Sequence, residues 1–240
     1  MAPVLVSVVI PALDEAAGIG ACLASVAAQA PPVEVVVVDG GSADGTPQVA
    51  RQSMPGAVVR DGPRGRARQM NDGAASTRGD LLLFLHADTR LPVDALDRAR
   101  AALAGGAVGG CFRTRFAPDA GHPPFGRLGR GLMRLWEGRL WMRWHRFAFG
   151  DRALFVRRDV FERIGGFPEQ PLFEDLDLVR ALRRHGRFAF VDADVVTSAR
   201  RFARHGALRQ QLRNLGLWLS WNAGVSPTRL KRFYSDHDRG

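Results

Sequence analysis

The sequence predicts an α/β fold in which a mostly parallel central sheet carries helices on both faces. Over the first half of the chain, short apolar runs alternate with segments of helical periodicity, as in successive β-α-β units. The run at 81–85 is apolar at every position and the run at 33–38 at all but one, which is typical of buried parallel strands. Both runs end in polar and acidic residues, at the edge where open α/β sheets place their ligands.

The individual elements follow from local patterns. We expect strands at 6–12, 33–38, 57–60, 81–85 and 108–116, and helices at 16–28, 46–52, 66–76 and 92–104. An Asp44-Gly45 turn precedes the helix at 46–52. Ile19, Leu23 and Val26 share one face of the first helix. Pro92 stands at the first turn of the last helix, where its missing N–H costs no hydrogen bond. A weaker helical pattern covers 208–221.

The pattern changes after residue 116. Residues 117–131 are rich in Gly and Pro and predict a loop, and residues 128–149 are dense in Trp and Arg. On a helical wheel the apolar side chains of this second stretch share one face: Leu132, Met133, Trp136, Leu140, Trp144 and Phe147. The stretch therefore predicts a basic amphipathic helix, which either docks on the sheet or lies on an anionic membrane surface.

Composition narrows the class of protein only partly. The chain has 240 residues, a formal net charge of +10 and a pI of about 11.3, and all but one of its 34 basic residues are arginine. This balance suits anionic partners, but genome base composition explains it equally well. Cys22 and Cys111 predict neither a disulfide framework nor a zinc site. With no signal peptide and no long apolar run, the cytoplasm is the expected location.

The first strand lacks the glycine pattern of dinucleotide-binding proteins. It leads into Pro11, Leu13 and Glu15 with no glycine before Gly18, so the G-x-G-x-x-G turn is missing. A P-loop is missing from the sequence as well. A diphosphate group would have to be held in another way, and a divalent cation at Asp88 has the chemistry to do it.

The order of the motifs resembles that of family 2 glycosyltransferases. The matching stretches are SVVIPALDE at 7–15, VDGGSADGT at 38–46, GRARQMN at 65–71, GD at 79–80, HAD at 86–88, GD at 150–151, FVRR at 155–158, IGGF at 164–167 and EDLDL at 174–178. Together they cover about residues 5–190. HADT at 86–89 and TSARR at 197–201 further resemble a small bacterial subgroup, the radical-SAM and selenodomain-associated transferases.

The resemblance implies a GT-A fold, with a Rossmann-like, mostly parallel sheet, helices on both faces and a C-terminal helical segment. Residues 1–240 would form one domain. Its nucleotide-sugar-binding half would cover about 1–116 and its acceptor-side half about 117–200, followed by a C-terminal helical extension at 201–240. The implied activity is transfer of a sugar, hexosyltransferase-like, from a nucleotide-diphosphate sugar to an acceptor hydroxyl.

The resemblance also implies roles for residues on the donor side. Pro11 and Glu15 would line the nucleotide pocket, and Asp39 would accept hydrogen bonds from the base or the ribose. Arg68 and Asn71 would face the donor from their helix. Asp39 followed by two glycines is, alternatively, a turn aspartate that bonds its own backbone.

A divalent cation, Mg²⁺ or Mn²⁺, is implied at Asp88, where it would bridge the donor diphosphate. His86 stands where the family usually has an acid, and it would face the donor nucleotide. Because imidazole ligates Mn²⁺ better than Mg²⁺, the choice between the two ions stays open. Asp88 is, alternatively, a cap of the segment that follows it.

Asp175 would be the general base that takes the acceptor proton, with Glu174 orienting it, so that a single displacement inverts the sugar. Both acids also suit the first turn of a helix, which favours negative charge. Gly150 and Asp151 would lie on the acceptor side. The stretch after Asp175 lacks a Gln-x-x-Arg-Trp motif, which indicates a non-processive enzyme.

The acceptor is not specified by the sequence, although the amphipathic stretch suits a lipid or another hydrophobic molecule. Peripheral contact with the inner face of the cell membrane is therefore an expectation, and nucleic acid is not an expected partner. Arg200, Arg201 and Arg204 follow the last matching stretch and either contact the donor diphosphate or form a solvated basic face.

Two other classes of protein stay open at this point. One is a nucleotidyltransferase with a related sheet, although the Gly-rich loop after the first strand is missing. The other is a non-catalytic protein that uses the Trp/Arg-rich stretch at 131–146 to bind nucleic acid or a membrane.

Overall fold

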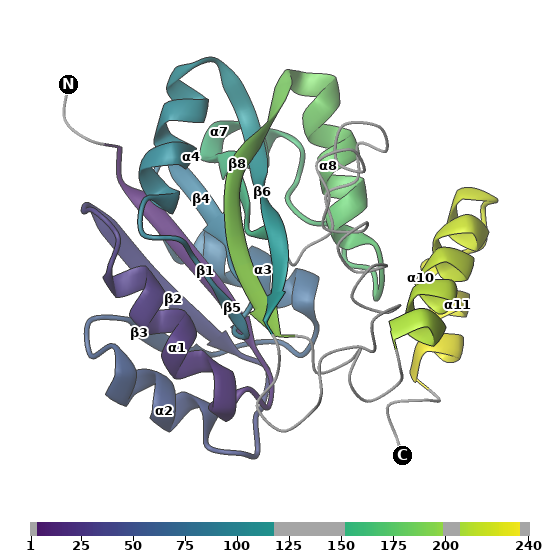
Figure 1. Cartoon of the computed structure of the whole chain (residues 1–240), viewed down its shortest axis with the longest axis horizontal. Coiled ribbons are helices and arrows are strands. Elements are labelled where there is room, and N and C mark those ends of the chain that lie inside the picture. Colours follow the sequence, from purple (N-terminus) through teal and green to yellow (C-terminus); the bar gives the residue numbers. More distant parts are fainter. Residues whose placement is uncertain (1–3, 118–151, 199–206, 236–240) are drawn as a thin grey trace.

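Eight strands form one sheet in the computed structural model, which describes residues 4–117, 152–198 and 207–235 (Figure 1). The strands are β1 (Val6–Ala12), β2 (Val33–Asp39), β3 (Val58–Asp61), β4 (Leu81–Phe84), β5 (Thr89–Arg90), β6 (Ala107–Ala117), β7 (Leu154–Arg157) and β8 (Arg187–Ser198). The helices are α1 (Ala16–Ala27), α2 (Thr46–Ser53), α3 (Arg66–Ala75), α4 (Ala95–Ala104), α7 (Arg158–Arg163), α8 (Glu174–His185), α10 (Ala207–Asn222) and α11 (Pro227–Ser235).

The strand order is β3-β2-β1-β4-β7-β6-β8-β5. The first four strands of this order are parallel, as predicted, and so is the pair of β6 and β8. β7 enters antiparallel between β4 and β6, and β5 pairs antiparallel with β8 at the far edge. The short segment from β4 to β5 therefore joins the middle of the sheet to its edge, and the sheet curls.

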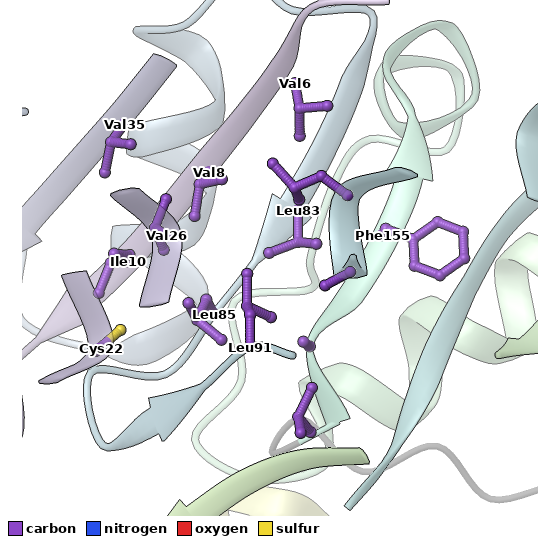
Figure 2. Close-up of a cluster of buried hydrophobic side chains, with 14 of the residues drawn as sticks. Val6, Val8, Ile10, Cys22, Val26, Val35, Leu83, Leu85, Leu91 and Phe155 are labelled. Atoms are coloured by element: carbon purple, nitrogen blue, oxygen red, sulfur yellow. The ribbon is translucent and has the colours of Figure 1, made fainter. Parts of the chain in front are cut away.

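Two apolar cores cover the two faces of this sheet. Alternation along β1 sends Val8 and Ile10 to one face and Val9 to the other. The first core packs beneath α1 and α4, and Figure 2 shows Cys22 and Val26 of α1 beside the strand residues. The second core packs beneath α3, α7 and α8. Helices on both faces are therefore confirmed.

Glu34 of β2 fastens the end of the sheet opposite to the candidate site. Its Oε1 accepts hydrogen bonds from Ser7 Oγ at 2.6 Å, Arg78 N–H at 2.6 Å and Gly79 N–H at 2.7 Å. Burial raises the pKa of this carboxyl, but the hydrogen bonds together outweigh burial and hold the pKa below its usual value. The ionised carboxylate thus stabilises the turn that leads into β4.

Most predicted boundaries lie within one or two residues of the observed ones, with one clear difference. α4 begins at Ala95 and not at Pro92, because Pro92 O accepts a hydrogen bond from Ala95 N–H in a turn that precedes the helix. The predicted loop at 117–131 and amphipathic helix at 128–149 lie outside the described residues, except for Ala117, which ends β6.

The C-terminal helices α10 and α11 lie beside α8 (Figure 1). The Trp221 ring of α10 stacks on Phe173, with ring centroids 4.9 Å apart, and Arg180 of α8 lies 3.7 Å above the same ring. Gly224, with a φ of +91°, makes the turn between the two helices. None of the described helices combines the length and the apolar character needed to cross a bilayer.

Candidate active site

Three loops meet at the carboxyl ends of β1, β2 and β4. The register places Ala12 beside Asp39, so β1 and β2 end at the same level. Leu85 N–H donates to Val9 O at 3.0 Å, which brings the end of β4 alongside. Pro11 is buried within β1. The topology therefore gathers the loops at 12–15, 39–46 and 85–89 at one edge, as predicted for a ligand site in an α/β sheet.

The first two loops are fastened to each other by side chains that the sequence did not single out. Asp14 N–H donates to Ser42 Oγ at 2.9 Å, and Ala43 N–H donates to Asp14 Oδ1 at 2.8 Å. Glu15 N–H donates to Thr46 Oγ1 at 2.8 Å. Asp14 holds a φ of +53°, a conformation that non-glycine residues rarely adopt and that often marks functional sites.

Asp44 joins the starts of α1 and α2. Its Oδ1 accepts hydrogen bonds from the hydroxyl and the N–H of Thr46, and its Oδ2 accepts one from Ala16 N–H at 2.9 Å. The hydrogen bond from the Thr46 hydroxyl, and then that from Ala16, lower the pKa of Asp44. The Asp44-Gly45 turn was visible in the sequence, but its partner across the loops was not.

Asp39 is almost fully buried, with 3% of its surface exposed. Its Oδ2 accepts hydrogen bonds from Gly41 N–H at 3.0 Å and Ser42 N–H at 2.9 Å, and the Ser42 hydroxyl donates to Oδ1. The carboxylate therefore organises its own loop, in the manner of the turn aspartate considered above. Contact with a donor base or ribose stays a prediction.

Gln69 of α3 is a site residue that the sequence did not predict. Its buried Nε2 donates to Ala12 O and Val38 O, both at 2.8 Å, and so ties together the ends of β1 and β2. An added Cβ at Gly40 would lie 3.0 Å from the same nitrogen, so the backbone approaches closely here. Only the three-dimensional register shows this role.

Three side chains of α3 reach the segment that leads into α8. The Asn71 amide both donates to Phe167 O and accepts from Phe167 N–H, each at 2.9 Å. Arg68 Nε donates to Glu169 Oε2 at 2.9 Å, and this ion pair is exposed. The structure thus gives Asn71 and Arg68 partners in the protein, and their predicted contact with the donor stays a prediction.

The third link joins α3 to the predicted catalytic acids. Arg66 Nη1 lies 3.6 Å from Glu174 Oε1, and Glu174 is only 4% exposed. Asp175 follows it in the first turn of α8, and its Oδ1 accepts a hydrogen bond from Leu176 N–H at 2.8 Å. Phe173, with a φ of +66°, precedes both acids and aims the start of the helix.

The predicted metal residue, Asp88, lies between β4 and β5 and is partly exposed. Its Oδ1 accepts long hydrogen bonds from the hydroxyls of Thr89, at 3.3 Å, and Thr197, at 3.4 Å. The two threonine hydroxyls are 3.0 Å apart, because β5 and β8 pair at this position. Thr197 therefore belongs to the candidate site, although it is 109 residues away in sequence.

Helix α1 packs directly beneath the loop that carries Asp88. An added Cβ at Gly18 would lie 3.2 Å from Ala87 O, and Cys22 Sγ lies 3.5 Å from His86 O. Burial, and then the negative charges of Asp88 and Glu15, raise the pKa of the Cys22 thiol above its usual range.

The donor set fits a cation that the substrate helps to hold. Among the described residues, no cluster of three or more His, Cys, Asp or Glu side chains forms a closed metal site. Asp88 with His86 supplies one carboxylate and one imidazole, and Mg²⁺ or Mn²⁺ typically combines one or two protein ligands with substrate phosphates. Gly150, Asp151, Arg200, Arg201 and Arg204 lie outside the described residues.

The family model for "Glycosyl transferase family 2" matches residues 7–165. The chain therefore belongs to glycosyltransferase family 2. It is 32% identical to glycosyltransferase AglE of Haloferax volcanii over 174 residues, a region that makes up 68% of this chain and 56% of AglE. It is 30% identical to the beta-monoglucosyldiacylglycerol synthase of Synechocystis over 166 residues, a region that makes up 63% of this chain and 34% of the synthase. The chain thus spans about half or less of these relatives.

Solved structures show that the fold is of the GT-A type. The S. aureus TarS structure with UDP superposes with a TM-score of 0.63 at 19% identity, over 80% of this chain and 60% of the TarS chain. The mannosyltransferase PcManGT of Pyrobaculum calidifontis, solved with GDP-Man and Mn²⁺, superposes with a TM-score of 0.63 at 20% identity, over 93% of this chain and 66% of the PcManGT chain. Both likenesses concern the architecture alone.

Proposed function

We propose that this protein is an inverting, non-processive glycosyltransferase that moves a sugar from a nucleotide-diphosphate sugar to an acceptor hydroxyl. The observation that carries the proposal is the meeting of three loops at one sheet edge, all within the stretch that the family model matches. α3 crosses from these loops to the first turn of α8 and so joins the donor side to the proposed base.

The donor nucleotide would lie over the ends of β1 and β2. Pro11 and Glu15 flank one loop, and Asp39 keeps the other in shape through its own hydrogen bonds. Arg68 of α3 has an exposed guanidinium group, which suits phosphate or base oxygen atoms. The similar TarS structures contain UDP or UDP-GlcNAc, and the similar PcManGT structure contains GDP-Man, which supports a nucleotide-sugar donor for this protein.

Asp88, with His86, would hold a divalent cation against the donor diphosphate. When bound, such a cation supplies positive charge that stabilises the leaving nucleoside diphosphate. The protein positions this pair through the Thr89 and Thr197 hydroxyls on one side and α1 on the other. The presence of Mn²⁺ in the PcManGT structure supports this assignment.

Asp175 would accept the proton of the acceptor hydroxyl as that oxygen attacks the anomeric carbon. The attack forms the new glycosidic bond, breaks the bond to the diphosphate and inverts the anomeric centre. Glu174, held by Arg66, would keep the start of α8 and its base in place. Both acids are nearly buried, so bulk water is kept from the proposed base.

The acceptor is proposed to be a lipid or another hydrophobic molecule, reached by a cytoplasmic enzyme at the inner face of the membrane. One relative is named as a synthase of a glucosyl diacylglycerol, which supports a lipid acceptor. Membership of the subgroup of radical-SAM and selenodomain-associated transferases is also proposed, and it rests on HADT at 86–89 and TSARR at 197–201.

A nucleotide panel and one pair of variants test the proposal. UDP, GDP, dTDP, ADP and CDP are each added with Mg²⁺, Mn²⁺ or EDTA, and the melting temperature is measured. With the nucleotide so identified, release of nucleoside diphosphate from its sugar conjugates is followed in the native protein, Asp175→Asn and Asp177→Asn. Asp177 lies in the same first turn and bonds Gln170, so it is the matched control.

We expect Asp175→Asn to lower kcat by at least about 100-fold with nucleotide binding unchanged, as for loss of a general base. Asp177→Asn is expected to stay within a few-fold of the native rate. Equal rates in all three proteins would overturn the role of Asp175, and no thermal shift with any nucleotide would overturn the proposed activity.

A further inference from the structure

The C-terminal helix α10 has a second apolar face that points away from the protein. Leu212, Leu215 and Leu219 stand at i, i+3 and i+7, and 60%, 41% and 54% of their surfaces are exposed. On a helix these positions form one stripe. Contiguous exposed apolar side chains of this kind are typical of interaction surfaces.

The opposite face of α10 is already used within the protein. Gln210 is 5% exposed and Trp221 stacks on Phe173, so this face packs against the body. Arg180 Nη2 donates to Asn222 Oδ1 at 3.0 Å and fixes the end of the helix to α8. The leucine stripe therefore lies on a helix that contacts the body of the protein, on the side turned away from Gln210 and Trp221.

Positive charge is concentrated on α10 and on the adjoining helix α11. Arg209 is exposed beside it on the helical wheel, with Arg213 one turn further on. The adjoining helix α11 adds exposed cations at Arg229, Lys231 and Arg232. The sequence from 195 to 235 contains no Asp or Glu at all. A leucine stripe whose charged neighbours are all cations complements a surface that is apolar inside and anionic outside.

We propose that the leucine stripe of α10, with the basic residues of α10 and α11 beside it, docks on an anionic phospholipid bilayer. The helix would lie in the plane of the interface, with the leucines among the acyl chains and the cations among the headgroups. This extends the lipid-acceptor part of the proposed function by naming the surface that contacts the lipid.

Two other occupants fit the surface less well. A second copy of the chain would, in a two-fold dimer, bring the same cations of both copies together without acids to balance them. Single-stranded nucleic acid is bound by exposed aromatic rings, whereas the α10 ring of Trp221 is stacked between Phe173 and Arg180.

The position of α10 connects the bilayer to the candidate active site. Trp221 touches Phe173, and Phe173 is the residue immediately before the acids Glu174 and Asp175. Docking through α10 would therefore hold the start of α8, with its proposed base, near the membrane surface. An acceptor with its hydroxyl at the level of the headgroups would be delivered on that side.

The test measures binding of the whole protein to vesicles by flotation. The vesicles contain either phosphatidylcholine alone or phosphatidylcholine with phosphatidylglycerol, and each set is repeated at raised salt. The compared proteins are the native chain, the double variant Leu212→Gln/Leu219→Gln and the control Val93→Gln. Val93 is 77% exposed in the turn before α4, so its substitution also removes exposed apolar surface.

We expect the native chain and Val93→Gln to float with the anionic vesicles only, and raised salt to release them. The double leucine variant should bind at least about tenfold more weakly, because burial of the two side chains is lost. Its melting temperature should match that of the native chain, since both side chains are exposed. Absence of binding, or equal binding by the leucine variant, would overturn the proposal.

Two further readouts exclude the other occupants. Light scattering reports whether the native chain is a dimer that the leucine variant separates, and an oligonucleotide titration reports nucleic-acid binding. Either result without vesicle binding would overturn the proposal in favour of that partner. Because no nucleotide sugar is added, failure of this test leaves the proposed sugar transfer unaffected, and the reverse also holds.

Discussion

Replacement of Gln69 by methionine tests whether this one side chain joins the ends of β1 and β2 at the candidate site. Methionine has a similar length and no hydrogen-bond donor, so Gln69→Met removes the two hydrogen bonds to Ala12 O and Val38 O while keeping most of the buried volume. Ala12 O keeps its hydrogen bond from Gly40 N–H, so that carbonyl is not left without a donor.

The expected cost follows from these contacts. Two hydrogen bonds at about 0.5–1.5 kcal/mol each give a loss of about 1–3 kcal/mol in the free energy of unfolding. For a chain of this size that corresponds to a fall of roughly 2–12 °C in melting temperature. Because the ends of β1 and β2 would also lose the donor that they share, the nucleotide-induced rise in melting temperature should shrink.

The assay is urea unfolding of Gln69→Met and the control Gln48→Met. Gln48 is exposed on α2, so its variant should stay within about 0.5 kcal/mol of the native protein. If Gln69→Met were as stable as the control and bound nucleotide equally well, Gln69 would not organise the site and the reasoning would be refuted.

Three further predictions concern Glu34, the cysteines and Gly18. The pKa of Glu34 is lower in the folded than in the unfolded protein, so the stabilisation from its carboxylate is present above the unfolded pKa of 4.5 and is lost as the pH falls through the folded pKa. In urea unfolding at several acidic pH values, Glu34→Gln should therefore lose less stability on acidification than the native chain. Burial raises the pKa of Cys111 to about 12 and that of Cys22 further, so neither thiol should react with a thiol reagent at neutral pH until the protein unfolds. A thiol that reacts fast in the native protein would contradict their burial. Gly18→Ala should weaken metal-dependent nucleotide binding, measured by calorimetry, because the new Cβ would press on Ala87 O at 3.2 Å; binding equal to that of the native chain would show that α1 does not support this loop.

The first half of the fold follows from the sequence because its elements carry local signals. β1 was predicted with its observed bounds, and Leu81 to Phe84 is apolar throughout, so a buried strand was the simplest interpretation. Turn residues such as Asp44 and Gly45 marked the start of α2. In each case a few neighbouring residues contain the relevant physical preference.

The curled side of the sheet could not be derived in this way. β5 is only two residues long, and it exists because Thr89 pairs with Thr197 across the sheet. The antiparallel place of β7 between β4 and β6 is set by its pairing with these two strands, which lie far from each other in the sequence. Neither pairing has a local pattern, because both are set by contacts between distant parts of the chain.

The residues of the candidate site also fall into those with a local sequence signal and those without one. Asp88, Asp39 and the Glu174–Asp175 pair stood out because each ends a strand or begins a helix. Gln69 and Thr197 did not, because an amide inside a helix and a hydroxyl inside a strand are ordinary in sequence. Their roles arise only where the carbonyl oxygen atoms of β1 and β2, or the carboxylate of Asp88, come within reach.

The most direct test of the central claim is calorimetric binding of the selected nucleoside diphosphate, with and without the divalent cation, to the native chain, Asp88→Asn and Asp80→Asn. Asp80 is an exposed carboxylate at the opposite end of β4, so it controls for the loss of charge. We predict cation-dependent binding that weakens by at least about tenfold in Asp88→Asn and is unchanged in Asp80→Asn. Equal, cation-independent binding by all three proteins would contradict a donor site built around Asp88.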